Sequence, residues 1–329
     1  MPLEGSGYVL GVDGGASRTR CVIADLSGNL LARGSGGPSN PLTAGADTAA
    51  ESILTAISEA SKGRGIKAFK ASVMGVAGTD RPSGAEAIRS RLDGFDWGRF
   101  RIVSDATVAL AGATGCRPGV VVVSGTGSVA YGENEEGEKA RAGGWGWRLG
   151  DEGSGYTIGN SALIASLRAL DGRGPPTSLP NKIMRALDLD DLGGLVDLVY
   201  SKGMVNREIA TLNPLVGEAA EEGDTVAKRI LKEAGEELGL AASAVARRLR
   251  MTNAFPVALT GGVFNLAPVR EALGRKLGEA QPGCRIIEPR FEPYVGAALL
   301  ALRGLGAEID ESLLRRVEKS FGRLKGDWT

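Results

Sequence analysis

Apolar and polar positions along the first 115 residues predict a mixed α/β lobe. The pattern opens with three short alternating runs, separated by a glycine loop and by the turn "SGN", which predict an antiparallel meander. Helical spacing and buried apolar runs then alternate. The expected strands are residues 8–12, 19–26, 30–33, 71–78 and 101–105, and the expected helices are 46–62, 83–92 and 106–113.

The same order begins again at Gly119. Residues 119–144 give an apolar strand, a glycine-rich loop, a second strand, a polar turn and a third strand. Such self-similarity indicates two copies of one α/β unit, each opening with a hairpin that has glycine at its tip. We expect two related lobes, residues 1–115 and 116–329, that face one another across a cleft.

The second copy carries a helical insertion, expected over about 154–250. Its helices are expected at 154–170, 181–187, 192–200, 206–222 and 225–250. After the insertion come a strand that ends at Gly262, a helix to about 277, a strand at 284–289 and an apolar helix at 293–304. A closing amphipathic helix around 310–321 could pack back on the first lobe.

Charge and composition narrow the class of partner. Lys plus Arg and Asp plus Glu both number 39, so the basic surface of a nucleic-acid binder or a membrane-surface protein is not expected. No apolar run approaches the roughly 18 residues of a spanning helix. Cys21, Cys116 and Cys284 are dispersed and give neither a disulfide framework nor a paired metal site. We expect a protein of the reducing cytoplasm that binds small molecules or other copies of itself.

The chain contains no histidine. This absence excludes Ser-His-Asp and Cys-His nucleophilic catalysis, histidine-ligated zinc and imidazole bases. Acid–base chemistry therefore falls to carboxylates, lysine or tyrosine.

Three glycine loops follow strand ends. In "GVDGGASRT" the glycines lead into a strand rather than a helix, so neither a P-loop nor a Rossmann fingerprint is present. Taken alone, this loop is also explained as a plain Asp-Gly hairpin turn. The loop at 124–128, "SGTGS", offers backbone amides beside small side chains, and "TGG" at 260–262 precedes an expected helix N-terminus. Together the three loops indicate ATP bound between the lobes.

Two acids stand where a phosphoryl-transfer site needs them. Asp13 in the first loop could hold magnesium, which proteins bind through one or two carboxylates plus phosphate oxygens. Asp105, at the end of the strand "RIVSD", could accept the proton of an attacking hydroxyl. The alternative for Asp105 is a helix N-cap, and the two roles are compatible.

The stretch "AGGWGWRLGDEGSGY" at 142–156 is dense in glycine, tryptophan and acid. It suggests a rigid polar pocket able to hydrogen-bond several hydroxyls. The alternative is a helix capped by Asp151 or Ser154, with Trp145 and Trp147 in the core. The motif "GPSN" at 37–40 is likewise either a turn or a presenter of the Asn40 amide.

These motifs resemble one family over almost the whole chain. The motifs resemble those of the N-acetylglucosamine kinase and BadF/BadG-type ATPase group in both order and spacing. They are "GVDGGASRTR", "GPSN", "GVAG", "SDA", "GVVVVSGTGSVAYG", "GGWGWRLGDEGS" and "LTGGVFN". That group belongs to the superfamily of actin, sugar kinases and heat-shock chaperones. The chain looks most similar to the archaeal-type, broad-specificity ATP-dependent hexokinases of the group. The resemblance implies two actin-like (ribonuclease H-like) lobes with mixed sheets flanked by helices.

The resemblance also implies roles for individual residues. The two phosphate motifs and the adenosine motif match Asp13, Gly14, Gly15, Thr19, Gly125, Thr126, Gly127, Gly261 and Gly262. Asp105 matches the base that activates a sugar hydroxyl, usually the one on carbon 6. The positions that line the sugar match Asn40, Gly78, Asp105, Thr126, Gly143, Gly144 and Asp151. The implied cofactors are ATP and Mg²⁺, with the metal near Asp13, and the implied assembly is a homodimer.

Some departures bear on the substrate. This chain has Val129 and Ala142 where animal N-acetylglucosamine kinases have asparagine and cysteine, and "GTGSVA" resembles the hexokinase-like members. Its cysteines lack the cluster motif of the dehydratase activators, and it cannot supply the Cys/His zinc motif of ROK proteins.

The sequence predicts an ATP-dependent kinase of a hexose or amino-hexose, such as N-acetylglucosamine, glucosamine or glucose. The alternative is a nucleotide-gated ATPase switch or activator that acts on a protein partner. A sugar-binding regulator without catalysis is disfavoured, because Asp13 and Asp105 are both present.

Overall fold

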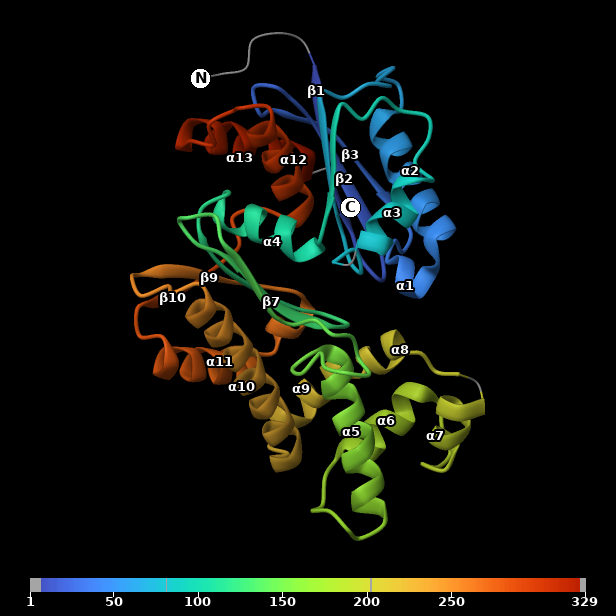
Figure 1. Ribbon diagram of the computed structural model, residues 1–329. Coiled ribbons are helices and arrows are strands. Elements are labelled where there is room, and N and C mark those ends of the chain that lie inside the picture. Colours follow the sequence, from blue (N-terminus) through green and yellow to red (C-terminus); the bar gives the residue numbers. More distant parts are fainter. Residues whose placement is uncertain (1–6, 81, 202, 326–329) are drawn as a thin grey trace. The chain divides into compact units, whose positions relative to one another are not determined.

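The strands of this protein form two sheets that repeat one topology. The computed structural model describes residues 7–80, 82–201 and 203–325, and within them each sheet has five strands (Figure 1). The strand orders are β3-β2-β1-β4-β5 and, from the corresponding edge, β8-β7-β6-β9-β10. In each sheet the antiparallel meander is extended by two parallel strands. The internal repeat predicted from the sequence is therefore confirmed.

The observed strands lie close to the predicted ones. Their bounds are β1 Tyr8–Gly14, β2 Thr19–Asp25, β3 Leu30–Gly36, β4 Ala71–Val76, β5 Arg99–Val103, β6 Gly119–Ser124, β7 Ser128–Glu133, β8 Lys139–Gly143, β9 Phe255–Thr260 and β10 Cys284–Ile287. One difference concerns Asp105, which was expected to end a strand. β5 ends at Val103, and Asp105 is the first residue of a helix.

Helices fill the remaining connections. Before β6 they are α1 Pro41–Ala44, α2 Ala46–Ser61, α3 Pro82–Arg89 and α4 Asp105–Thr114. Between β8 and β9 they are α5 Gly155–Leu170, α6 Leu179–Leu187, α7 Gly194–Val196, α8 Asn206–Ala210, α9 Asn213–Glu221 and α10 Thr225–Arg248. The last three are α11 Ala267–Ala280, α12 Pro293–Gly304 and α13 Glu311–Lys325.

Two of the predicted insertion helices are interrupted. The helix expected over 206–222 breaks into α8 and α9, because Pro214 has no amide hydrogen and is tolerated only in the first turn of a helix. The helix expected over 192–200 becomes the single turn α7 followed by a π-helical turn, Asp197–Ser201.

The chain divides into two compact units. Unit 1 comprises residues 1–119 and 288–329, and unit 2 comprises residues 120–287. The segment 288–329 thus belongs to unit 1. The reason is that α12 packs on β1, β4 and α4, and α13 packs on β3. The sequence suggested a return to the first lobe for its closing helix but placed α12 in the second lobe.

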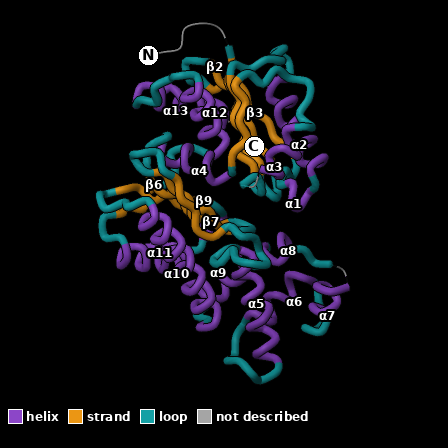
Figure 2. Tube along the Cα trace, in the orientation of Figure 1, coloured by secondary structure: helices purple, strands orange, loops and turns teal. Residues whose placement is uncertain are grey.

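Unit 1 has helices on both faces of its sheet (Figure 2). One cluster joins β1 residues such as Leu10 to α2 and α3 residues such as Ile53 and Ile88. The other cluster lies on the opposite face, where Val9 and Val73 meet the apolar helix α12. The two clusters alternate along β1, as expected for a strand buried on both sides.

Helix α12 lies against its neighbours at backbone distance. A Cβ added at Gly11 of β1 would overlap the backbone of Tyr294 and Ala298, and one added at Gly296 would overlap Val108 and Gly112 of α4. The amide of Phe291, just before α12, donates to the carbonyl of Gly112 at 3.1 Å. The glycines therefore permit an approach that any side chain would prevent.

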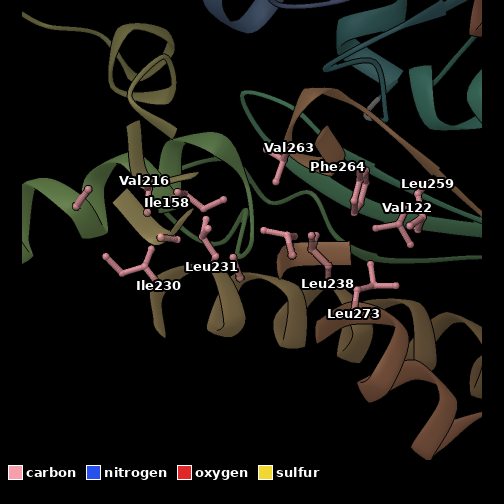
Figure 3. Packing of buried hydrophobic residues seen from close by; sticks show 14 of the residues in the cluster. Val122, Ile158, Val216, Ile230, Leu231, Leu238, Leu259, Val263, Phe264 and Leu273 are labelled. Atoms are coloured by element: carbon pink, nitrogen blue, oxygen red, sulfur yellow. The ribbon is translucent and has the colours of Figure 1, made fainter. Parts of the chain in front are cut away.

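Unit 2 is built around one core. In Figure 3, Leu238 of α10 and Leu273 of α11 lie beside Val122 and Leu259 of the sheet. The same cluster continues through Leu231 to the insertion helices. None of the helices in the described parts of the chain is both long enough and apolar enough to cross a membrane.

We predict that Gly11→Ala lowers stability by about 1 to 3 kcal/mol, because overpacking against backbone atoms cannot be relieved by a side-chain rotation. Urea denaturation followed by circular dichroism measures the change. The matched control is Gly304→Ala at the end of α12, where the added methyl meets open space and the midpoint should stay within about 0.5 kcal/mol of wild type. Equal midpoints for Gly11→Ala and wild type would contradict this account of the packing.

Candidate active site

Asp13 sits near the end of β1, in the middle of the first sheet. It lies opposite Arg20 on β2 and Gly75 on β4. The side chain is half-buried, and burial raises the pKa of Asp13 to about 7, with further raising by Asp105 and Glu292 and opposition from Arg20 and Arg18. Arg20 also pairs with Glu292, the N-cap residue of α12, at 3.5 Å. The carboxyl group therefore occupies a place where a cation would be favourable.

The loop after Asp13 is held by a second loop of unit 1. The Gly15 amide donates to the Arg18 carbonyl at 2.9 Å and closes the hairpin, so the plain-turn interpretation describes the backbone correctly. The Ser39 amide donates to the Gly15 carbonyl at 2.9 Å. Thr19 is fully buried and its hydroxyl donates to the Gly37 carbonyl at 2.7 Å, so this side chain anchors the loop from within.

Asn40 and Gly78 lie in contact. The Asn40 side-chain oxygen accepts from the Leu42 amide at 2.9 Å and caps α1. The two interpretations of "GPSN", a turn or a presenter of the Asn40 amide group, are therefore compatible. Gly78 follows β4 with φ +81°, and a Cβ there would be 2.5 Å from Asn40 Oδ1. The Ala77 amide also donates to the Gly14 carbonyl at 2.8 Å. The ends of β1 and β4 thus bring the Asp13 loop, Asn40 and Gly78 into one cluster.

Asp105 is the first residue of α4 rather than its cap. The N-cap position belongs to Ser104, whose hydroxyl lies 3.0 Å from that of Thr107. One carboxylate oxygen of Asp105 accepts from the Ala106 amide at 2.9 Å. Burial raises the pKa of Asp105 to about 6, with a contribution from Asp80, while the amides of Ala106 and of Asp105 itself lower it. A carboxyl group tuned into this range can exchange protons near neutral pH.

In unit 2, the loop Gly125–Gly127 joins β6 to β7 as a tight turn. The Gly125 amide donates to the Gly127 carbonyl at 2.9 Å, and the Gly155 amide donates to the Gly125 carbonyl at 2.8 Å. The start of α5 therefore packs directly on the loop. A Cβ at Gly127 would be 2.8 Å from Asp151 Oδ2, so the loop and Asp151 are also in contact.

Asp151 organises the glycine–tryptophan loop. Its backbone has φ +61° and its side chain is 8% exposed, with Oδ1 accepting from the Gly146 amide at 3.2 Å. Burial raises the pKa of Asp151, and the amides of Gly146 and Ser128 lower it. Gly143 and Gly144 both have φ +70° and shape the approach to this loop. The α5 cap is Ser154, which accepts from the Thr157 amide at 3.1 Å.

The two tryptophans of this loop are not core residues. Trp145 is 61% exposed and Trp147 is 39% exposed. An arginine lies over the face of each ring. The guanidinium carbon of Arg141 is 4.5 Å from the ring centre of Trp145, and that of Arg148 is 4.8 Å from the ring centre of Trp147. Such stacking holds exposed aromatic rings in place without burying them. The core interpretation of these tryptophans is therefore wrong.

The third glycine loop closes the end of β9. Gly261 has φ +112°, and a Cβ there would overlap the carbonyl of Ser124 at the end of β6. Gly262 is exposed, with open space where a side chain would stand. A 3-10 turn, Gly262–Asn265, separates it from α11, which begins at Ala267. The sequence predicted the N-terminus of a helix directly after this loop. The structure has a short 3-10 turn there instead, and the helix begins later.

Within each unit, the sequence-predicted residues therefore gather. Unit 1 brings together Asp13, Gly14, Gly15, Thr19, Asn40 and Gly78. Asp105 belongs to the same group because its negative charge raises the pKa of Asp13. Unit 2 brings together Gly125, Thr126, Gly127, Asp151 and Gly261. Sequence reasoning missed Ser39, although it stands within the quoted "GPSN" motif, and Glu292, which no local pattern marks.

The described residues contain no group of three or more acidic or cysteine side chains able to hold a metal ion. A cation beside Asp13 would thus depend on ligands from a bound nucleotide and from water.

Comparisons with known proteins agree on one family. The sequence profile of the BadF/BadG/BcrA/BcrD ATPase family matches residues 10–301. An N-acetylmuramic acid/N-acetylglucosamine kinase of Clostridium acetobutylicum is 37% identical over 299 residues, which cover 89% of this chain and 98% of that protein. An N-acetyl-D-glucosamine kinase of Dictyostelium discoideum is 33% identical over 314 residues, which cover 89% of this chain and 97% of that protein.

Among solved structures, a Chromobacterium violaceum protein assigned as an N-acetylglucosamine kinase matches with a TM-score of 0.73 at 30% identity. The match covers 90% of this chain and 99% of that one. The resemblance drawn from the motifs is confirmed, as is the fold class of two actin-like lobes with mixed sheets flanked by helices.

We predict that Asp151→Ala loosens the loop at 143–150. Alanine at φ +61° is strained and cannot accept from Gly146, which together cost about 1 to 3 kcal/mol, whereas Asp151→Asn tolerates the conformation and keeps an acceptor. Tryptophan fluorescence during urea denaturation and the rate of tryptic cleavage after Arg148 measure the effect. Glu152→Gln, at an exposed neighbour, is the control. If Asp151→Ala resists trypsin as wild type does, Asp151 does not hold the loop.

Proposed function

We propose that this chain, which belongs to the BadF/BadG/BcrA/BcrD ATPase family, is an ATP-dependent kinase of a hexose or amino-hexose. It transfers the γ-phosphate to a sugar hydroxyl, that on carbon 6, and its substrates include N-acetylglucosamine, glucosamine or glucose. The observation that carries the proposal is that two relatives at 37% and 33% identity, aligned along nearly their whole lengths, are both named amino-sugar kinases.

ATP is the phosphoryl donor in this proposal. In unit 1, Gly14 and Gly15 carry no side chains and so would let a phosphate approach the turn after Asp13, and Thr19 keeps that turn in place through its hydrogen bond to the Gly37 carbonyl. In unit 2, Gly125, Thr126 and Gly127 present a loop without bulky side chains for phosphate, and Gly261 and Gly262 serve the adenosine. Gly262 supports this role because nothing of the chain occupies the space beside it.

Mg²⁺ fits the carboxyl group of Asp13. Burial together with the negative charges of Asp105 and Glu292 disfavours the ionised form of Asp13, and a divalent cation would offset that cost. Magnesium usually takes only one or two protein carboxylates and completes its shell with phosphate oxygens and water. When bound, it would neutralise charge on the transferred phosphoryl group.

Asp105 is the general base. Its carboxylate would accept the proton of the attacking sugar hydroxyl. At the start of α4, Oδ1 accepts a hydrogen bond from the Ala106 amide, and Oδ2 is the oxygen that would take the proton. Asn40 and Gly78 in unit 1 and Thr126, Gly143, Gly144 and Asp151 in unit 2 are the proposed sugar-lining residues. Their amide, hydroxyl and carboxyl groups suit an acceptor rich in hydroxyls.

We also propose that the enzyme works in the cytoplasm as a homodimer, with small molecules rather than nucleic acid or membrane as its other partners. The equal numbers of acidic and basic residues support only the part about nucleic acid and membrane, and the homodimer is what the family resemblance implies.

We predict sugar-dependent ADP release. Wells with Mg²⁺ and ATP receive no sugar, glucose, mannose, glucosamine, N-acetylglucosamine or N-acetylmannosamine, and a coupled assay follows ADP. One or several sugars should raise the rate well above the sugar-free well and so rank the substrates. Equal rates in all wells would instead indicate the ATPase-switch class, and the proposal would fail.

We predict that Asp105→Asn lowers kcat by about 10² to 10⁴, the usual contribution of general base catalysis, while ATP binding changes little. Steady-state kinetics and calorimetric titration of ATP separate the two effects. Asp80→Asn is the matched control, since it removes a charge that acts on Asp105 without removing the base. Full turnover by Asp105→Asn would sink the assignment.

The same base predicts a pH dependence. The pKa of Asp105 is raised to about 6, and the base must be ionised. At saturating Mg²⁺, which keeps Asp13 ionised, kcat/KM should be level above pH 6 and fall about tenfold per unit below it. Asp80→Asn removes a neighbouring negative charge and should move the midpoint to lower pH. A wild-type profile that stays level to pH 5, with the fold intact by circular dichroism, would contradict this role.

A further inference from the structure

A groove of about 420 Å³ lies in unit 2 between helix α10 and the strands β7 and β8. Its lining includes Gly143, which we place at the sugar. Its volume falls within the range of about 300 to 1,000 Å³ that is usual for small-molecule sites. The groove therefore has room for a ligand group of its own.

The groove is continuous with the sugar-lining glycines. Val129 on β7 pairs with Gly143 on β8, and a Cβ added at Gly144 would lie 2.9 Å from Val129 Cγ2. Val129, Ala142 and Gly143 all line the groove. A sugar ring in contact with the two glycines would thus lie directly beside it.

The wall that α10 supplies is long. It extends from Glu237 to Arg247, ten positions apart, which is about 15 Å along the axis at the α-helical rise of about 1.5 Å per residue. An acetyl group adds only two carbon atoms to a sugar nitrogen and would occupy a small part of this length. The groove therefore suits a further ring better than a small substituent.

Trp145 gives the groove an aromatic surface. Its side chain is 61% exposed, and the guanidinium of Arg141 over the ring holds it in place. Arg248 donates to the Arg141 carbonyl at 2.7 Å and so ties this part of β8 to α10. Leu240, which is 42% exposed, and Ala244 line the same groove. A fixed apolar and aromatic lining suits the C–H face of a pyranose ring.

Three charged side chains of the groove have no partner among the residues that the structure describes. Glu152, Glu237 and Arg247 line it, and their side chains make neither an ion pair nor a hydrogen bond there. Other charges of α10 are paired, as in the contact of Arg229 with Glu233 at 3.2 Å. Carboxylates accept hydrogen bonds and a guanidinium donates them, whereas a sugar hydroxyl can do both. These side chains therefore suit the hydroxyl rim of a pyranose ring.

We infer that this groove is a second sugar subsite, which holds a pyranose ring joined by a glycosidic bond to the ring that is phosphorylated. The inference rests on the proposed function, because the sugar-lining role of Gly143 and Gly144 sets where the first ring lies. The acceptors then include a terminal unit of a disaccharide as well as free hexoses. The second ring contributes to binding and takes no part in phosphoryl transfer.

Calorimetric titration without nucleotide and steady-state kinetics with Mg²⁺ and ATP test the inference on the full chain. The ligands are glucose and N-acetylglucosamine, together with cellobiose, maltose and N,N′-diacetylchitobiose, whose rings are substituted on carbon 1 or on carbon 4. We expect at least one disaccharide to bind at least about tenfold more tightly than its monosaccharide. Its KM should fall by a similar factor at similar kcat, because contacts remote from the reacting hydroxyl act equally on ground state and transition state.

Two variants locate the effect in the groove. Ala244→Phe places a ring in the groove, and Trp145→Ala removes the aromatic surface. Each should bring the Kd and KM of the preferred disaccharide to within about twofold of the monosaccharide values and leave the monosaccharide values within about twofold of wild type. Lys228→Phe is the matched control, since it adds the same ring to an exposed position of α10 outside the groove and should keep the disaccharide preference.

The outcomes separate the subsite from the kinase reaction. If monosaccharides are phosphorylated but no disaccharide binds more tightly than its monosaccharide, the subsite is overturned and the kinase stands. A disaccharide preference that survives both groove variants, or that Lys228→Phe abolishes with the fold intact by circular dichroism, would also overturn it. If no sugar releases ADP, the kinase proposal fails. Calorimetry then still decides, since tighter disaccharide binding that Ala244→Phe abolishes supports the subsite and its absence overturns it.

Discussion

The close packing of α12 on β1 is the contact on which the Asp13 side of unit 1 depends. Gly11, Gly112 and Gly296 remove the Cβ atoms that would hold the elements apart, so backbone meets backbone over two crossings. This packing brings residues more than 280 positions apart in sequence into one core. It also sets Glu292, at the start of α12, beside Arg20 and within electrostatic reach of Asp13. The geometry of the Asp13 loop is thus secured from the far end of the chain.

The buried carboxyl groups of Asp13 and Asp105 in unit 1 cost folding free energy, but their raised pKa values suit proton transfer and cation binding. Burial raises the pKa of Asp13 and Asp105, and each is raised further by another acidic side chain. A protein selected only for stability would not gather these acids, which lie near the end of β1 and at the starts of α4 and α12. Their cost is understandable if a cation and a substrate hydroxyl meet them during the reaction.

In unit 2 the rigidity comes from backbone rather than from charge. The loop Gly125–Gly127 is closed by its own hydrogen bond, by the start of α5 and by Asp151 packed against Gly127. Asp151 in turn holds the glycine–tryptophan loop through the Gly146 amide. The result is a set of small residues fixed in position, which suits close approach by a bound ligand.

The sequence alone determined the repeat, the strands and the glycine loops, because local periodicity and turn chemistry specify them. It also determined that carboxylates must carry any acid–base role, since histidine is absent. Tertiary structure decided the rest. Helix α12 joins unit 1 because its apolar surface and Gly296 fit β1 and α4, Asp105 starts α4 instead of ending a strand, and the tryptophans remain exposed under stacked arginines. The place of α12 depends on contacts between residues far apart in the chain, and the exposure of the tryptophans depends on which surfaces the remainder of the fold leaves uncovered. No local pattern records either outcome.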